Sequence, residues 1–295
     1  MDASYEPRAG RLAMGSPTGP GEIAYLDYGP PDRAPDLVFL HANGFNARAY
    51  RTILGPLAGD LRMIAPDQRG HGATMLATDR PRTSWLDLKD DLLAFLDAMR
   101  IERVALAGHS MGGTVSLFAA AEAPARVRAL SLFDPVIRSP GPVSAVSPAA
   151  MAASPMVGGA IRRRRSFPSR AAAVEGYRGR GAFRTWTEAM LEDYVTAGFR
   201  DMPDGTVELA CTPEWEVSNY VNQAHDSWSA FFSSICPIRV LRAETESPGR
   251  IDGHVEELTA TGRIRVGTVP GTTHFLPMER PELVREAILE AVRAA

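Results

Sequence analysis

The chain is poor in cysteine, which excludes one class of protein at once. Only two of its 295 residues are cysteines, Cys211 and Cys236. Two thiols in a chain of this length cannot form the disulfide framework that stabilises small secreted domains. We therefore expect both to be reduced and buried, where they act as small hydrophobic side chains.

The sequence also lacks long hydrophobic runs and a strong excess of charge. No stretch of about 18 apolar residues is present, so no membrane-spanning helix is predicted. The N-terminal segment MDASYEPRAGRLAMG has no apolar core of a signal peptide, so we expect a cytoplasmic protein. The net charge of -3 argues against binding to nucleic acid or to an anionic membrane.

What the sequence does contain is an alternation of short apolar and longer amphipathic segments. Residues 11–16, 22–28 and 37–40 predict a β-meander with Gly- and Pro-rich turns. Further strands are expected at 63–65, 104–107, 127–133, 238–241 and 266–269, and helices at 49–57, 85–99, 114–122, 255–261 and 281–294. Apart from the meander, this order predicts an α/β fold whose sheet is mostly parallel and flanked by helices.

The alternation stops between residues 135 and 234. That stretch has clusters of Pro, Gly and Ser, a run of arginines and a helix-like segment at 182–198. We interpret it as an inserted, mainly helical cap over the carboxyl ends of the strands. The predicted organisation is a core formed by residues 1–134 and 235–295, with a cap at 135–234. A second independent domain is disfavoured because the alternation resumes afterwards.

The segment VALAGHSMGGTVSLFAA is the most informative part of the chain. It predicts a strand, a tight turn and a helix, and the turn contains the G-x-S-x-G pattern of a nucleophile elbow. Ser110 would project its hydroxyl from a strained backbone, while glycines at 108 and 112 avoid collisions with the neighbouring strand and helix. We therefore identify Ser110 as the candidate nucleophile.

A serine nucleophile that attacks a carbonyl group needs two N–H donors for the resulting oxyanion. One is expected to be the backbone N–H of Met111, the residue after the nucleophile. The other is expected in the loop His41-Ala42-Asn43-Gly44-Phe45, most simply the backbone N–H of Asn43. For His41 we expect a structural hydrogen bond that shapes this loop.

A general base is expected after the last predicted strand, where GTTHF places His274 in a loop that can reach over the sheet. The carboxylate that orients it is less defined. Asp134 follows the strand at 127–133 and is the leading candidate; Glu246 is the alternative and Glu244 the third.

Together these residues resemble the α/β-hydrolase superfamily, as an esterase- or lipase-like member with a cap. PDQRGHG at 66–72 is similar to the family's loop after its fourth strand, HANGF to its oxyanion loop with Ala42 in place of the usual glycine, and GTTHFLPMERPE to its histidine loop. The resemblance implies an eight-stranded sheet. Where the family commonly has an aspartate after its seventh strand, this chain has AETE; other members place the acid where Asp134 stands.

The predicted activity is hydrolysis of a carboxylic ester through an acyl-Ser110 intermediate, without metal or organic cofactor. The same serine, histidine and carboxylate could serve other reactions, which therefore remain open: hydrolysis of a lactone, a thioester or a C–C bond, and acyl transfer, including peracid formation. We expect a small ester-type substrate and leave a homodimer open. The arginines at 162–165 are interpreted as a solvated run, with an anchor for a substrate anion as the alternative. Trp186, Trp215 and Trp228 are expected to pack the cap, some of them lining an acyl pocket.

Overall fold

The fold is taken from a computed structural model that describes residues 5–80, 82–138, 140 and 153–294. Its centre is an eight-stranded sheet in the order β1-β2-β4-β3-β5-β6-β10-β11. All neighbouring strands from β4 to β11 run parallel, and β1 and β2 form an antiparallel edge. The predicted mostly parallel sheet is therefore confirmed.

The strands of this sheet are β1 (Arg8–Ser16), β2 (Gly19–Tyr28), β3 (Leu37–Leu40), β4 (Met63–Pro66), β5 (Val104–His109), β6 (Val127–Phe133), β10 (Ile238–Ala243) and β11 (Ile264–Val269). The flanking helices are α1 (Arg51–Leu54), α2 (Leu86–Ala98), α3 (Met111–Glu122), α9 (Ser227–Ser233), α10 (Val255–Thr259), α11 (Leu276–Glu279) and α12 (Pro281–Arg293). Within the described residues, no helix is long and apolar enough to cross a membrane.

The predicted β-meander is wrong at its third strand. β1 and β2 form the expected hairpin, but β2 continues to β4, and β3 lies between β4 and β5. The reason is burial: every residue of β3 is at most 1% exposed, so this strand is covered on both faces, as a central parallel strand must be. An edge strand of a meander would alternate between buried and exposed positions.

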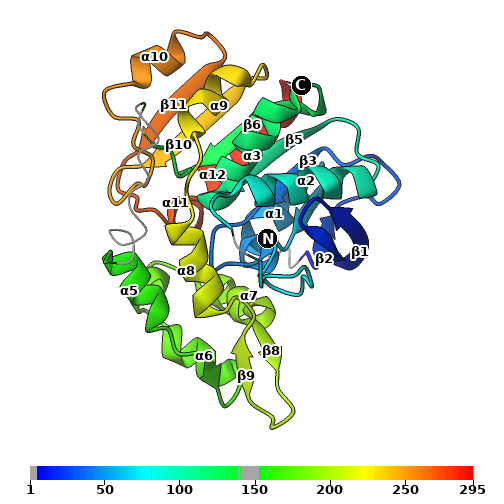
Figure 1. Cartoon of the computed structure of the whole chain (residues 1–295), viewed down its shortest axis with the longest axis vertical. Helices are drawn as coiled ribbons and strands as arrows, with labels where there is room; N and C mark the ends of the chain where they lie inside the picture. Colours follow the sequence, from blue (N-terminus) through cyan, green and yellow to red (C-terminus); the bar gives the residue numbers. More distant parts are fainter. Residues whose placement is uncertain (1–4, 81, 139, 141–152, 295) are drawn as a thin grey trace.

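Two apolar clusters cover the two faces of the sheet. Along β5, Ala105 and Ala107 belong to one cluster, and Val104 and Leu106 belong to the other, as the alternation of a strand requires. The first cluster joins the sheet to α1 and α12, and the second joins it to α2, α3 and α9 (Figure 1). Both faces are therefore closed, and only the strand ends are left to form a site.

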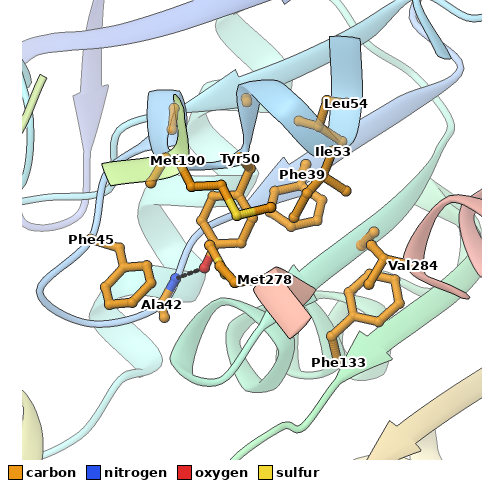
Figure 2. Packing of buried hydrophobic residues seen from close by; sticks show 14 of the residues in the cluster. Phe39, Ala42, Phe45, Tyr50, Ile53, Leu54, Phe133, Met190, Met278 and Val284 are labelled. Carbon is orange, nitrogen blue, oxygen red and sulfur yellow. Dashed lines mark hydrogen bonds between the residues drawn. The ribbon is translucent and has the colours of Figure 1, made fainter. Parts of the chain in front are cut away.

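The first cluster reaches the loop that follows β3. In Figure 2, Phe39 and Tyr50 pack side by side, with ring centroids 4.7 Å apart. The expected single helix at 49–57 is broken into a 3-10 turn at Ala47–Tyr50, the short α1 and a second 3-10 turn at Gly55–Leu57. Pro56 in the last turn has no N–H for the helical ladder, which accounts for the break.

The segment inserted between β6 and β10 is described from residue 153 onward, and the expectation for residues 139 and 141–152 falls outside the described residues. It contains α5 (Pro155–Ile161), α6 (Arg170–Tyr177), α7 (Glu188–Gly198) and α8 (Pro213–Val221). Residues 182–187, expected to be helical, precede α7, whose first turn is capped by Thr187. In Figure 1 these four helices lie together on one side of the core.

This insertion also contains a small sheet that the sequence did not predict. β7 (Ser166–Phe167), β9 (Val207–Leu209) and β8 (Phe199–Asp201) pair in that spatial order, antiparallel to one another. The last helix of the segment, α9, packs instead on α3 of the core (Figure 1).

Candidate active site

The loops that follow β3, β5, β6 and β11 meet at the carboxyl edge of the parallel sheet. This is the edge at which α/β proteins generally bind ligands, because the connections there diverge to both faces. The loops carry the residues singled out by the sequence: Asn43 after β3, Ser110 after β5, Asp134 after β6 and His274 after β11.

The turn after β5 holds Ser110 in a strained conformation. Its backbone angles are φ 55° and ψ -121°, a region that L-residues with a side chain rarely adopt, and its N–H donates to Phe133 O at 2.9 Å. A Cβ atom on Gly112 would lie 2.3 Å from Leu40 O, and one on Gly108 would lie 2.5 Å from the carbonyl carbon of Gly112. The predicted crowding at both glycines is confirmed.

The structure brings Ser110, His274 and Asp134 into one line of hydrogen bonds. His274 Nε2 lies 2.9 Å from Ser110 Oγ, and His274 Nδ1 lies 2.6 Å from Asp134 Oδ2. The Asp134 side chain is 0% exposed and that of His274 is 23% exposed. The imidazole is thus bonded on one side to a wholly buried carboxylate and on the other to the strained serine.

Asp134 is held by more than the histidine. Its other carboxylate oxygen, Oδ1, accepts hydrogen bonds from Ala243 N–H at 2.9 Å and from the Ser247 hydroxyl at 2.6 Å. Burial raises the pKa of Asp134, but the bonds and charge of His274, together with these two donors, outweigh it and leave the pKa below its ordinary value. Asp134 is therefore ionised at neutral pH. Ser247 was missed, because nothing in its local sequence marks it as a partner of a residue so far away.

The two alternative acids have other surroundings. Glu244 Oε2 accepts from Gly271 N–H at 2.9 Å, which braces the start of the His274 loop. Glu246 is exposed, with φ 58°, and lines a cavity of about 150 Å³ beside Thr273 and Phe275. The structure therefore brings Asp134, rather than either glutamate, into contact with His274.

The side chain of Asn43 is fully engaged with the inserted segment. Its Nδ2 donates to Glu216 O at 3.0 Å, and its Oδ1 accepts from Asn219 Nδ2 at 2.8 Å, both on α8. The N–H of the preceding Ala42 donates to the Tyr50 hydroxyl. Among the hydrogen bonds of the described residues, none uses the Asn43 N–H. Met111 is the first residue of α3, where a helix leaves its N–H groups without an internal acceptor.

Two buried histidines shape the loop after β3. His41 Nε2 accepts from Gln68 N–H at 2.9 Å, and His71 Nε2 accepts from Gly44 N–H at 3.0 Å. The opposite nitrogens lie 2.8 Å from Ala42 O and 2.9 Å from Arg69 O. The structural role expected for His41 is confirmed. The matching role of His71, which lies in the PDQRGHG segment at 66–72, was not predicted.

The arginine run is only partly a solvated surface. Arg162, Arg164 and Arg165 are exposed, as expected. The interpretation is wrong for Arg163, whose guanidinium bonds to Glu216 Oε2 and to the Tyr194 hydroxyl, each at 2.5 Å. Tyr194 in turn donates to Gly44 O at 3.1 Å. A run of identical residues has no pattern from which its one half-buried member could be identified.

Aromatic rings of the insertion and the core meet beside these loops. Phe45 contacts Trp186 edge to face at 5.3 Å between centroids and stacks with Phe275 at 6.3 Å. Trp215 donates from Nε1 to Arg69 O, and Trp228 packs in the core cluster on the other face of the sheet. Trp186 thus contacts the loop after β3 through its ring. Cys211 and Cys236 are buried and free, as predicted.

A metal site has no support in the part of the chain that the structure describes. There, no group of three or more His, Cys, Asp or Glu side chains is arranged to hold an ion.

A model of the alpha/beta hydrolase family matches residues 37–287. The chain belongs to the alpha/beta hydrolase family. The match begins at β3 and ends within α12, so it includes all four loops of the candidate site and the whole inserted segment.

Curated relatives match this alpha/beta hydrolase over part of its length. It is 30% identical to 3-hydroxybutyrate-oligomer hydrolase of Cupriavidus necator over 131 residues, or 44% of this chain and 45% of the relative. It is 37% identical to 2-hydroxy-6-oxo-2,4-heptadienoate hydrolase of Pseudomonas putida over 109 residues, or 34% of this chain and 37% of the relative. The chain thus spans less than half of each of these relatives.

Solved structures match it over almost the whole chain. The crystal structure of E-2-(acetamidomethylene)succinate hydrolase superimposes with a TM-score of 0.78 and covers 98% of this chain and 100% of the other. The sequence identity is 20%, so this likeness shows the shared fold alone.

The buried histidines predict a loss of stability in mild acid. Burial lowers the pKa of His41 to about 4, of His109 to about 3 and of His225 to about 4, and that of His71 well below 6.5. Below pH 6.5 the unfolded chain takes up protons that the folded chain does not bind. Each group therefore lowers the free energy of unfolding by about 1.4 kcal/mol per pH unit down to its folded pKa.

Two carboxylates, Asp67 and Asp193, oppose this trend, because burial raises the pKa of both. Burial raises the pKa of Asp67 to about 6, so this group stabilises the folded chain as the pH falls from about 6 to its ordinary value of 3.8. The four histidines outnumber these two carboxylates, and urea unfolding at about pH 7.5, 6 and 5 should give a steadily falling free energy of unfolding. A constant or rising value would contradict the neutral state of these histidines.

Proposed function

We propose that the protein is a serine hydrolase that cleaves a carboxylic ester through an acyl-Ser110 intermediate. The observation that carries this proposal is the line of hydrogen bonds from Ser110 Oγ through His274 to the buried Asp134. A serine on a strained turn has no structural need for a histidine and an ionised carboxylate in line with it. The same arrangement makes its hydroxyl a nucleophile.

In the acylation step, Ser110 Oγ attacks the ester carbonyl carbon while its proton passes to His274 Nε2. Asp134 accepts the Nδ1–H of His274, fixes this tautomer and stabilises the imidazolium that forms. His274 then donates the proton to the alcohol leaving group, which breaks the C–O bond. In deacylation, a water molecule takes the place of the alcohol, gives its proton to His274 and releases the acid, and the proton returns to Ser110.

The tetrahedral oxyanion would be bound by the backbone N–H groups of Asn43 and Met111. Three features support this assignment: Ala42 N–H is bonded to Tyr50, Asn43 N–H has no acceptor within the described residues, and Met111 N–H opens α3. The N-terminus of α3 also favours negative charge at this point. The Asn43 side chain is bonded to α8 and is not part of the proposal.

We further propose that the inserted segment, residues 135–234, acts as a cap that shapes the substrate site. Trp186 from this segment contacts Phe45 of the loop after β3, and Phe45 stacks with Phe275, the neighbour of His274. An aromatic wall so close to the reacting groups favours an acyl group with apolar surface. Arg163 is already bonded to Glu216 and Tyr194, so we do not assign it to a substrate anion.

Replacement of the nucleophile tests the proposal directly. The Ser110→Ala variant should lose at least roughly 10⁴-fold in kcat toward short p-nitrophenyl esters, because no covalent intermediate can form. Circular dichroism should show an intact fold. A folded variant that still turns over these esters would refute the proposal, and a reactive phosphonate should label the wild-type chain at Ser110 and leave the variant unlabelled.

The acid is tested by two matched carboxylate-to-amide changes. Asp134→Asn should lower kcat by roughly 10³- to 10⁴-fold, because the amide cannot stabilise the imidazolium and favours the wrong tautomer. Glu246→Gln makes the same chemical change on an exposed residue and should leave kcat within about twofold. If only the glutamine variant is inactive, the acid is Glu246 and the assignment of Asp134 fails.

C–C bond hydrolysis is the second candidate, favoured by one specific observation. The chain is 37% identical, over 109 residues, to a hydrolase that acts on 2-hydroxy-6-oxo-2,4-heptadienoate. The same serine and histidine would serve that reaction after the dienol is protonated to the ketone. A lactone, a thioester or an acceptor other than water would use the same groups with a different leaving group or nucleophile.

A direct comparison of substrates separates the two candidates. We expect kcat/KM for p-nitrophenyl butyrate to exceed that for 2-hydroxy-6-oxo-2,4-heptadienoate by roughly 100-fold or more, since Arg163 is already bonded to Glu216 and Tyr194 and is not assigned to the dienoate carboxylate. Loss of the dienoate absorbance would measure the second reaction. The opposite order of the two values would identify the protein as a C–C hydrolase.

A further inference from the structure

A buried chain of hydrogen bonds joins the loop after β3 to the loop that carries His274. The Tyr50 hydroxyl bonds to Ala42 N–H at 3.2 Å and to His109 Nδ1 at 2.7 Å. The other nitrogen of that ring, His109 Nε2, lies 2.8 Å from the carbonyl oxygen of His274. Figure 2 shows the first of these bonds, with Tyr50 reaching across to the backbone of Ala42.

The direction of every bond in this chain follows from chemistry. A carbonyl oxygen can only accept, so His109 Nε2 carries the hydrogen. Both Tyr50 and His109 are 0% exposed, and burial lowers the pKa of His109 to about 3, so the ring is neutral and its Nδ1 must accept. The Tyr50 hydroxyl then donates to Nδ1 and accepts from Ala42 N–H. No member of the chain changes its protonation between mild acid and mild base.

We propose that Tyr50 and His109 are positioning residues for the reaction. Through these two side chains, the loop that carries Asn43 is joined to the backbone of the general base, His274. The link passes through His109, the residue directly before the nucleophile. This inference rests on the proposed serine hydrolase activity, because the loops that it places are those of Asn43 and His274. It assigns a role to two residues that the sequence motifs leave without one.

The placement has a specific consequence for the oxyanion. With its N–H held by Tyr50, Ala42 cannot donate to a substrate, and the next amide, that of Asn43, is left to do so. At the other end, the bond to His274 O restrains the main chain from which the imidazole extends. A shift of about 1 Å in either loop would disturb the transition state much more than the bound ester, because the oxyanion forms only after attack.

The decisive variant is Tyr50→Phe, which removes one oxygen and keeps the ring that packs on Phe39. We expect kcat to fall about 10- to 100-fold with KM unchanged. Phenylboronic acid, whose tetrahedral adduct on Ser110 places an oxygen in the oxyanion site, should lose affinity by the same factor as kcat/KM. A purely structural role would lower the melting temperature without this matched loss.

Tyr28→Phe is the control. Tyr28 is likewise 0% exposed in the same apolar cluster, and its hydroxyl has no partner among the described residues. Its removal should leave kcat and boronate affinity within about twofold of wild type. If Tyr50→Phe is folded and also stays within twofold, the proposal is overturned.

His109→Gln tests whether the two residues act as one unit. If they do, the variant that carries both Tyr50→Phe and His109→Gln should have a kcat no more than about twofold below that of the less active single variant. If the fold losses in kcat of the two single variants multiply in the double variant, Tyr50 and His109 act independently and the proposal of one hydrogen-bonded unit is overturned. Phosphonate labelling of Ser110 keeps the outcomes apart: absence of labelling in the wild type would reject the hydrolase itself, whereas labelling with unchanged Tyr50→Phe kinetics would reject only the positioning role.

Discussion

The contact between the first turn of α3 and the end of β3 is the constraint on which the site depends. Gly112 approaches the carbonyl oxygens of Leu40 and His41 so closely that no side chain fits between them. This approach holds Ser110 at its positive φ, a strained backbone conformation that costs about 1–3 kcal/mol and is maintained by the packing on both sides. It also fixes the loop after β3 beside the nucleophile, because that loop begins at the same carbonyl groups.

The inserted segment is bonded directly to the loop after β3. Asn43 is bonded through both side-chain atoms to α8, and Gly44 O accepts from Tyr194 of α7. The loop therefore lies between two bodies: the core, through Tyr50 and His71, and the insertion, through α7 and α8. Any movement of α8 would be transmitted to the amide that we assign to the oxyanion, which couples the proposed cap to the chemistry.

The sequence was most informative where chemistry and local backbone geometry coincide. The elbow and the histidine loop are short motifs, and they named Ser110 and His274, which the structure brings together. Strand neighbours were harder, because pairing is decided between distant segments: nothing within residues 37–40 says that β4 lies between this strand and β2. The strands of the small sheet, of two or three residues each, are too short to show alternation.

Asp134 illustrates why a site is harder to predict than its motifs. Three carboxylates follow strands at the same edge of the sheet, and the sequence ranks them only by analogy. Contacts made by the folded chain decide between them. Asp134 follows β6, the strand beside β5, and its buried carboxylate bonds to His274, whereas Glu244 and Glu246 follow β10; Glu244 bonds to Gly271 N–H and Glu246 is exposed. In that buried space Asp134 gains the Ala243 amide and the Ser247 hydroxyl, both donated by the β10 side. The loop that carries the two exposed glutamates thus supports the aspartate. Asp134 remains ionised because His274, and then these two donors, outweigh the effect of burial on its pKa.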